Sequence, residues 1–176
     1  MADETVSIGG ERDSEADALP ESTVEELAER SRRLFQEIIN GLDVDAAVGI
    51  QSINGTDIQL DADGDEEGGG ILIGRRGQTL EAVQLLLSTI VARHTSRRVR
   101  VFLDAFGYRE RRAESLRQMA FEVAEQVLSA GQEALTEPLN AAERRIIHTA
   151  LQDMEGISTY SEGEEPNRYV VISPAE

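Results

Sequence analysis

The sequence contains no cysteine, no tryptophan and no lysine, so all 17 of its basic residues are arginines. Without lysine, the phosphate-binding loop that ends in Gly-Lys-Ser/Thr is excluded, as are enzymes that form a Schiff base on a lysine amine. Without cysteine, disulfides, thiolate nucleophiles and cysteine-ligated zinc or iron–sulfur sites are excluded. The two histidines, His94 and His148, are too few for most histidine-rich metal sites. We therefore expect a protein that binds a partner rather than an enzyme, with no cofactor and no metal site.

Long apolar segments are also missing. No apolar run approaches the length of a transmembrane helix, and residues 1–10 lack the basic-then-apolar pattern of a signal peptide. The sequence thus predicts a cytoplasmic protein with no membrane span. The acidic tract DADGDEE resembles part of a calcium loop, but Leu72 stands where such a loop requires its final Glu. A solvated acidic loop is the better interpretation.

The net charge of −17 conceals an uneven distribution. Residues 1–70 hold 4 Arg and 19 acids, residues 71–118 hold 10 Arg and 4 acids, and residues 119–176 hold 3 Arg and 11 acids. A basic segment therefore lies in the middle of an acidic protein. Arginines spread over solvated helix faces would give the same charge balance, so the position of each arginine must show whether it has a functional role. The exclusive use of arginine suits forked phosphate contacts, and it is equally compatible with a bias in genome base composition.

Hydrophobic periodicity predicts helices and strands in two groups, which together indicate an α+β protein of two small units. In the first group, a capping-box pattern at residues 22–25 opens a helix, and Asn54-Gly55 marks a hairpin between two short strands. A short apolar segment, a buried helix and a strand over residues 97–106 follow. In that strand Arg98, Arg100 and Phe102 are expected to face away from Val99, Val101 and Leu103.

The second group should contain a long helix over residues 108–130, a helix capped by Asn140 and Glu143, and a final pair of strands. The composition of the N-terminal residues, which is acidic and without apolar period, predicts disorder there. The predicted organisation is a disordered acidic tail (residues 1–21), a first domain (22–106) and a second domain (107–176).

The segment Gly74-Arg75-Arg76-Gly77 is the first motif with chemical meaning. Two glycines three residues apart let a loop approach a nucleic-acid backbone without a Cβ in the way. The loop also precedes a helix, where free N–H groups and the helix dipole favour an anion. The two arginines would add phosphate ligands. A GxxG loop that clamps a few backbone nucleotides is the recognition device of the KH module.

A helix–helix turn that uses glycine for its geometry is the alternative explanation of this motif. The preceding hairpin and the following arginine-rich strand favour the KH interpretation, in the type II order α-β-β-α-α-β. In that interpretation apolar residues beside the loop form a groove wall for bases, and strand arginines extend the positive surface. The predicted RNA contacts of the first domain are Ile71, Ile73, Gly74, Arg75, Arg76, Gly77, Leu80, Arg98 and Arg100.

A second motif is the pair Arg144 and His148, which lie four residues apart and so project from one face of a helix. Arginine can hold a phosphate in a fork, and a nearby phosphate favours the imidazolium form of histidine. A solvated arginine beside a capping or core histidine is the simpler explanation of the pair alone. The pair and the following segment, residues 161–171, resemble the R-three-H domain, a small α/β nucleic-acid module named for its Arg-x-x-x-His pair.

A KH domain followed directly by an R-three-H domain resembles the Jag family (the SpoIIIJ-associated proteins, also called KhpB or EloR). The resemblance covers residues 22–176, and its most specific segments are ILIGRRGQTLEAVQ, ERRIIHTALQ and TYSEGEEPNRYVVI. It implies a bacterial, cytoplasmic RNA-binding protein that associates with a small single-KH protein and influences cell elongation and division.

The function expected from these observations is binding of single-stranded RNA, or of single-stranded DNA, by two modules, in a post-transcriptional regulator. The alternative is a protein–protein scaffold that dimerises through its KH domain, with a small KH partner or with itself, and binds RNA only secondarily. An RNA-processing enzyme has little support, because no group of carboxylates has convincing metal spacing.

Overall fold

The computed structural model describes residues 22–64 and 68–175, so the predicted disordered tail lies outside the described residues. The chain divides into two compact units of mixed helices and strands, which confirms the predicted α+β class. The first unit runs to Gly74 and resumes at Gln78–Leu103, whereas the second unit comprises Arg75–Gly77 and everything from Asp104 onward. Three residues of the loop, Arg75–Gly77, thus group with the second unit.

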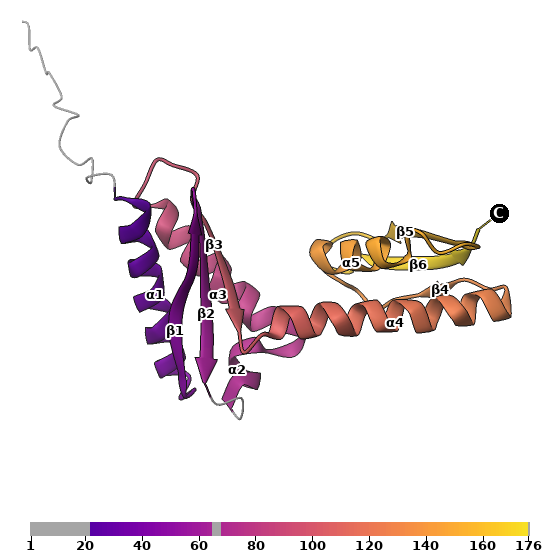
Figure 1. Cartoon of the computed structure of the whole chain (residues 1–176), viewed down its shortest axis with the longest axis horizontal. Coiled ribbons are helices and arrows are strands. Elements are labelled where there is room, and N and C mark those ends of the chain that lie inside the picture. Colours follow the sequence, from indigo (N-terminus) through magenta and orange to yellow (C-terminus); the bar gives the residue numbers. More distant parts are fainter. Residues whose placement is uncertain (1–21, 65–67, 176) are drawn as a thin grey trace, which may run out of the picture. The chain divides into compact units, whose positions relative to one another are not determined.

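The first unit is a three-stranded sheet with helices on one face (Figure 1). The strand order is β1-β2-β3, and β1 and β2 are antiparallel. Helices α1 and α3 pack against each other, and α1 packs on β1. The elements are α1 (Val24–Gly41), β1 (Ala46–Asn54), β2 (Asp57–Gly64), α2 (Gly69–Ile73), η2 (Arg75–Gly77), α3 (Gln78–Ala92) and β3 (Arg100–Ala105).

The local signals in this unit are mostly confirmed, with shifts of a few residues. The capping box that opens α1 joins Thr23 and Glu26, one residue later than predicted. The hairpin turn is Gly55-Thr56, because Asn54 still pairs with Asp57 at the end of the ladder. Alternation along β2 and β3 buries one face of the sheet against the helices. The core includes Leu27, Phe35, Ile39, Ile58, Leu60, Leu87, Val91, Val101 and Leu103.

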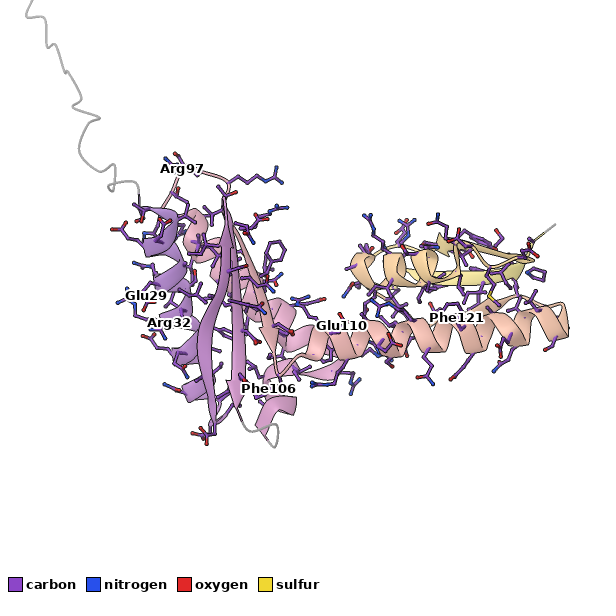
Figure 2. The ribbon with its side chains drawn as sticks, viewed as in Figure 1. Glu29, Arg32, Arg97, Phe106, Glu110 and Phe121 are labelled. Carbon is purple, nitrogen blue, oxygen red and sulfur yellow. The ribbon has the colours of Figure 1, made fainter. Side chains whose placement is uncertain are left out.

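Strand β3 begins at Arg100, three residues after the predicted start. The chain before it forms local turns, in which the Arg97 N–H bonds Thr95 Oγ1 at 3.1 Å and the Val99 N–H bonds the Arg97 carbonyl at 3.0 Å. These bonds replace the ladder that a strand would need. Arg98 consequently lies outside the sheet, in the exposed segment where Figure 2 labels Arg97.

The second unit packs a long helix and a short helix against a small antiparallel sheet of order β4-β6-β5. Strand β4 was not predicted, since two residues are too short to show a period. The core contains Leu116, Ala120, Ala124 and Val127 of the long helix together with Leu139, Ile147, Leu151, Val170 and Ile172. The elements are α4 (Tyr108–Ala130), β4 (Ala134–Leu135), α5 (Ala141–Leu151), β5 (Ile157–Glu162) and β6 (Tyr169–Pro174). Among the residues that the structure describes, no helix combines the length and apolarity needed to cross a membrane.

Candidate nucleic-acid interface

The loop between α2 and α3 has the backbone geometry that its glycines predict. Gly74 and Gly77 have φ values of +71° and +81°, in the left-handed region that favours glycine. Arg76 between them also has a positive φ, 55°. Gly77 directly precedes the first residue of α3, so the loop lies at the N-terminus of a 15-residue helix, where an anion is stabilised.

Neither glycine has room for a side chain. A Cβ on Gly74 would lie 2.1 Å from Thr79 Oγ1 and 2.9 Å from the Thr79 backbone nitrogen. A Cβ on Gly77 would lie 2.7 Å from the Tyr108 ring. The loop is therefore held close to its neighbours, and its conformation depends on both glycines.

We expect Gly74→Ala to lower the free energy of unfolding by about 1–3 kcal/mol, because the variant combines a left-handed backbone with a close contact. Gly70→Ala is the matched control, since Gly70 lies in α2 and a Cβ there meets nothing within 4 Å. Chemical denaturation measures both variants. Equal stability of the two variants would show that the loop does not require the geometry of Gly74.

The two loop arginines have different surroundings. Arg76 forms an ion pair with Glu137, which belongs to the same unit, and both side chains are about half exposed. Arg75 is exposed, and no ion pair joins it to another residue in the described part of the chain. Arg75 is therefore the loop arginine whose guanidinium is most available to donate hydrogen bonds to a phosphate.

The apolar residues beside the loop divide between surface and core. Ile71 is 60% exposed and Ile73 is half-buried, so both can form part of a groove wall. Leu80 is only 1% exposed, and this corrects its assignment as a base-contacting residue. Leu80 lies on the face of α3 that packs into the core, so its side chain contributes to the core and offers no surface to a ligand.

The two predicted RNA contacts near β3, Arg98 and Arg100, also have different surroundings. Arg98 is exposed and lies before the strand. Arg100 faces away from the helices, as the alternation predicted, but both ends of its guanidinium bind Asp57, at 2.8 and 2.6 Å. Arg100 also lies 5.6 Å from the centre of the Phe102 ring. Its positive charge is therefore largely balanced within the sheet.

In the second unit, Arg144 is a buried structural cation rather than an open one. Its side chain is 9% exposed, and it donates to the Leu139 carbonyl and to Glu165 Oε1, each at 2.7 Å. Its neighbour Glu143 accepts from Arg112 at 2.8 Å and completes the capping box at Asn140. These bonds tie the start of α5 to the chain that precedes β6.

His148 is bonded at both ring nitrogens. Nδ1 lies 2.8 Å from Thr159 Oγ1, and Nε2 lies 2.8 Å from Ser161 Oγ. The histidine thus joins α5 to β5. Burial lowers the pKa of His148 below its usual value of 6.5, and the positive charge of Arg144 lowers it further. The imidazole is therefore neutral at pH 7.

This pKa shift predicts a pH dependence of stability. Because the folded protein disfavours the imidazolium, the second unit should lose stability as the pH falls from 6.5 through the folded-state pKa of His148. Titration of the His148 imidazole by NMR should give a pKa below 6.5. A His148 pKa at or above 6.5 would contradict the assignment of a neutral, buried ring.

Sequence reasoning missed the partners of these side chains. Each partner is distant in sequence from the residue that it binds, so no local pattern connects partner and residue. These partners are Asp57, Glu137, Glu165, Thr159 and Ser161. Within residues 22–64 and 68–175, no group of three or more His, Asp or Glu side chains is arranged to hold a metal ion.

Comparisons with known proteins agree with the two-unit division. The family model described as "KhpA/KhpB, KH domain" matches residues 32–103, and the model of the R-three-H domain matches residues 114–174. The RNA-binding protein KhpB of Clostridium symbiosum is 37% identical over 149 residues, which are 85% of this chain and 67% of that protein. KhpB of Streptococcus pneumoniae serotype 2 is 38% identical over 149 residues, or 44% of its length. KhpB of Bacillus subtilis is 41% identical over 109 residues, which are 61% of this chain and 52% of that protein.

Proposed function

The chain belongs to the family of RNA-binding KhpB proteins, and we propose that it binds single-stranded RNA through its KH domain, with its R-three-H domain as a second module. The observation that carries the proposal is the loop of residues 74–77. Two glycines with positive φ hold its backbone at the N-terminus of α3, and Arg75 stands exposed beside them. The names of the relatives support the ligand class.

In the proposed mode of binding, RNA phosphates lie against the loop. The N–H groups at the start of α3 and the guanidinium of Arg75 bind phosphate oxygens, and Arg76 joins them when a phosphate displaces Glu137. Bases lie against Ile71 and Ile73, and Arg98 adds positive charge to the same unit. Because most of these contacts are ionic, the affinity should fall steeply as the salt concentration rises.

The roles of Arg144 and His148 follow from their contacts. Their hydrogen-bonding groups are already engaged by Leu139, Glu165 and two hydroxyls of β5. We propose that they act mainly by holding α5, β5 and the chain before β6 in position, so that neighbouring surface residues can meet RNA.

The cellular role that we propose is post-transcriptional regulation linked to cell elongation and division, in the cytoplasm and together with a small single-KH partner. Support comes from family membership and from the KH family model, whose name joins KhpA with KhpB. Since the match spans 44–67% of the relatives described above, this role concerns only what the two domains can do.

A scaffold that dimerises through its KH domain is the second candidate. Leu85 and Leu86, which are neighbours on α3, are 68% and 57% exposed. Exposed apolar side chains of this size often mark a protein–protein surface. None of these side chains belongs to the loop, so dimerisation and RNA binding are compatible.

Crosslinking in cells followed by RNA sequencing separates the two candidates. An RNA-binding protein should recover a reproducible set of enriched transcripts, and the set should shrink when the loop arginines are replaced. A pure scaffold would recover no enriched transcripts, which would overturn the proposal while leaving the dimer surface to be tested by the oligomeric state.

A further inference from the structure

A groove between α4 and α5 has no role in the function described so far. It is an open groove of about 360 Å³, lined by Arg117 of α4 and by Ala142, Arg145, Ile146, Thr149 and Ala150 of α5. All six residues belong to the second unit. A volume of this size is at the lower end of small-ligand sites. It therefore suits one flat ring and its immediate attachments rather than a large ligand.

One side of the groove is apolar, and its edge holds two arginines. Ala142, Ile146 and Ala150 follow one another at intervals of four residues, so they form one face of α5. Arg145 and Thr149, also four residues apart, are exposed along its edge. The six lining residues include no carboxylate. Glu110 and Glu114 pair with Arg117 beside the groove, so among the described residues Arg145 supplies the positive charge that no ion pair balances. A ligand with an apolar face and a negative charge placed at Arg145 is complementary to these walls.

The two arginines of the groove are prepared for different contacts. Arg117 is held by Glu114 at 2.9 Å and by Glu110, labelled in Figure 2, at 3.3 Å. Its charge is therefore balanced, and its planar guanidinium offers a surface on which a ring can stack. Arg145 has no ion-pair partner in the described part of the chain, so its charge is available to a phosphate.

We propose that this groove binds one nucleotide of single-stranded RNA, with the base between Ile146 and the guanidinium of Arg117 and the phosphate on Arg145. The hydroxyl of Thr149 lies at the rim, where it can bond the base edge or the ribose. This inference rests on the proposed RNA-binding function and assigns the contact surface of the second module. It also gives a role to buried Arg144, whose bonds to Leu139 and Glu165 hold the start of α5, the helix that contains Arg145 and Ile146.

The test uses the full chain and a fluorescent, mixed-sequence single-stranded RNA of about 12 nucleotides. Arg145→Glu removes the phosphate contact, and Ala142→Leu narrows the apolar side of the groove without a change in charge. Each should weaken binding about tenfold, in line with the value of one charge-assisted hydrogen bond or one stacked base. Arg145→Glu should also reduce the salt dependence of binding, whereas Ala142→Leu should leave it unchanged. Arg30→Glu, a charge reversal at an exposed position of α1, is the matched control and should bind as the wild type does.

The outcomes distinguish this inference from the proposed function. If the wild type binds RNA, replacement of the loop arginines abolishes binding, and both groove variants retain full affinity, the groove proposal is overturned and the loop proposal stands. The same result would favour a peptide that carries both apolar and acidic side chains as the occupant of the groove. Absence of RNA binding by the wild type would overturn both proposals. Circular dichroism of the variants shows whether each is folded, which is expected because both substituted positions are exposed.

Discussion

Replacing Arg75 and Arg76 together with Asp is expected to reduce the affinity for single-stranded RNA by at least about a hundredfold, because each charge-assisted contact contributes about 1.5–3 kcal/mol. The circular dichroism spectrum should be unchanged, since both side chains lie outside the core. Asp is the suitable replacement at position 76, where φ is 55°, because it tolerates a left-handed backbone better than most residues. Fluorescence anisotropy at two salt concentrations measures the effect.

The matched control for this variant is Arg30→Glu with Arg33→Glu. Both arginines are exposed on α1, so the control makes the same change in net charge away from the loop. It should alter the affinity less than about threefold, through long-range repulsion alone. If the two double variants lose affinity equally, net charge rather than the loop governs binding, and the loop would no longer be the site.

Arg144→Met is expected to destabilise the second unit by about 2–3 kcal/mol. The substitution keeps an aliphatic chain of similar length but removes the donors to the Leu139 carbonyl and to Glu165. A buried carbonyl left without its donor costs about 1–3 kcal/mol, and the lost ion pair with half-exposed Glu165 adds less. Arg145→Met is the control: it changes the same residue type at the next, exposed position and should shift stability by less than about 0.5 kcal/mol.

The distribution of tyrosine makes this measurement specific. The protein has no tryptophan, and its three tyrosines, at positions 108, 160 and 169, all lie in the second unit. Intrinsic fluorescence during urea denaturation therefore reports the unfolding of that unit alone. Equal midpoints for Arg144→Met and Arg145→Met would show that Arg144 is not a structural residue, and an open phosphate-binding role would then be the better explanation.

Most of the fold was predictable because its signals are local. Alternation along β3 correctly assigned Arg100 and Phe102 to one face and Val101 and Leu103 to the other. The two capping boxes and the hairpin turn mark element boundaries within a few residues. Strand β4 could not be predicted because two residues show no hydrophobic period. The predicted β3 was too long because hydrogen bonds within local turns replace the strand pairing before Arg100.

The environment of the site residues was less predictable because it depends on partners distant in sequence. Helical spacing correctly placed Arg144 and His148 on related positions of one helix. It could not show that Glu165 and the hydroxyls of β5 already occupy their hydrogen-bonding groups. Likewise, the charge of Arg100 depends on Asp57, which is 43 residues away. The net charge of −17 is a similar case, because it says nothing about the exposed cations Arg75, Arg98 and Arg145.

The central claim, that the loop of residues 74–77 contacts RNA, is tested most directly by ultraviolet crosslinking. The purified chain of 176 residues is irradiated with single-stranded RNA, and the crosslinked peptides are identified by mass spectrometry. We predict crosslinks within residues 71–80 that disappear when Arg75 and Arg76 are both replaced by Asp. Crosslinks confined to other parts of the chain, or no crosslinks under conditions where RNA binds, would contradict this claim.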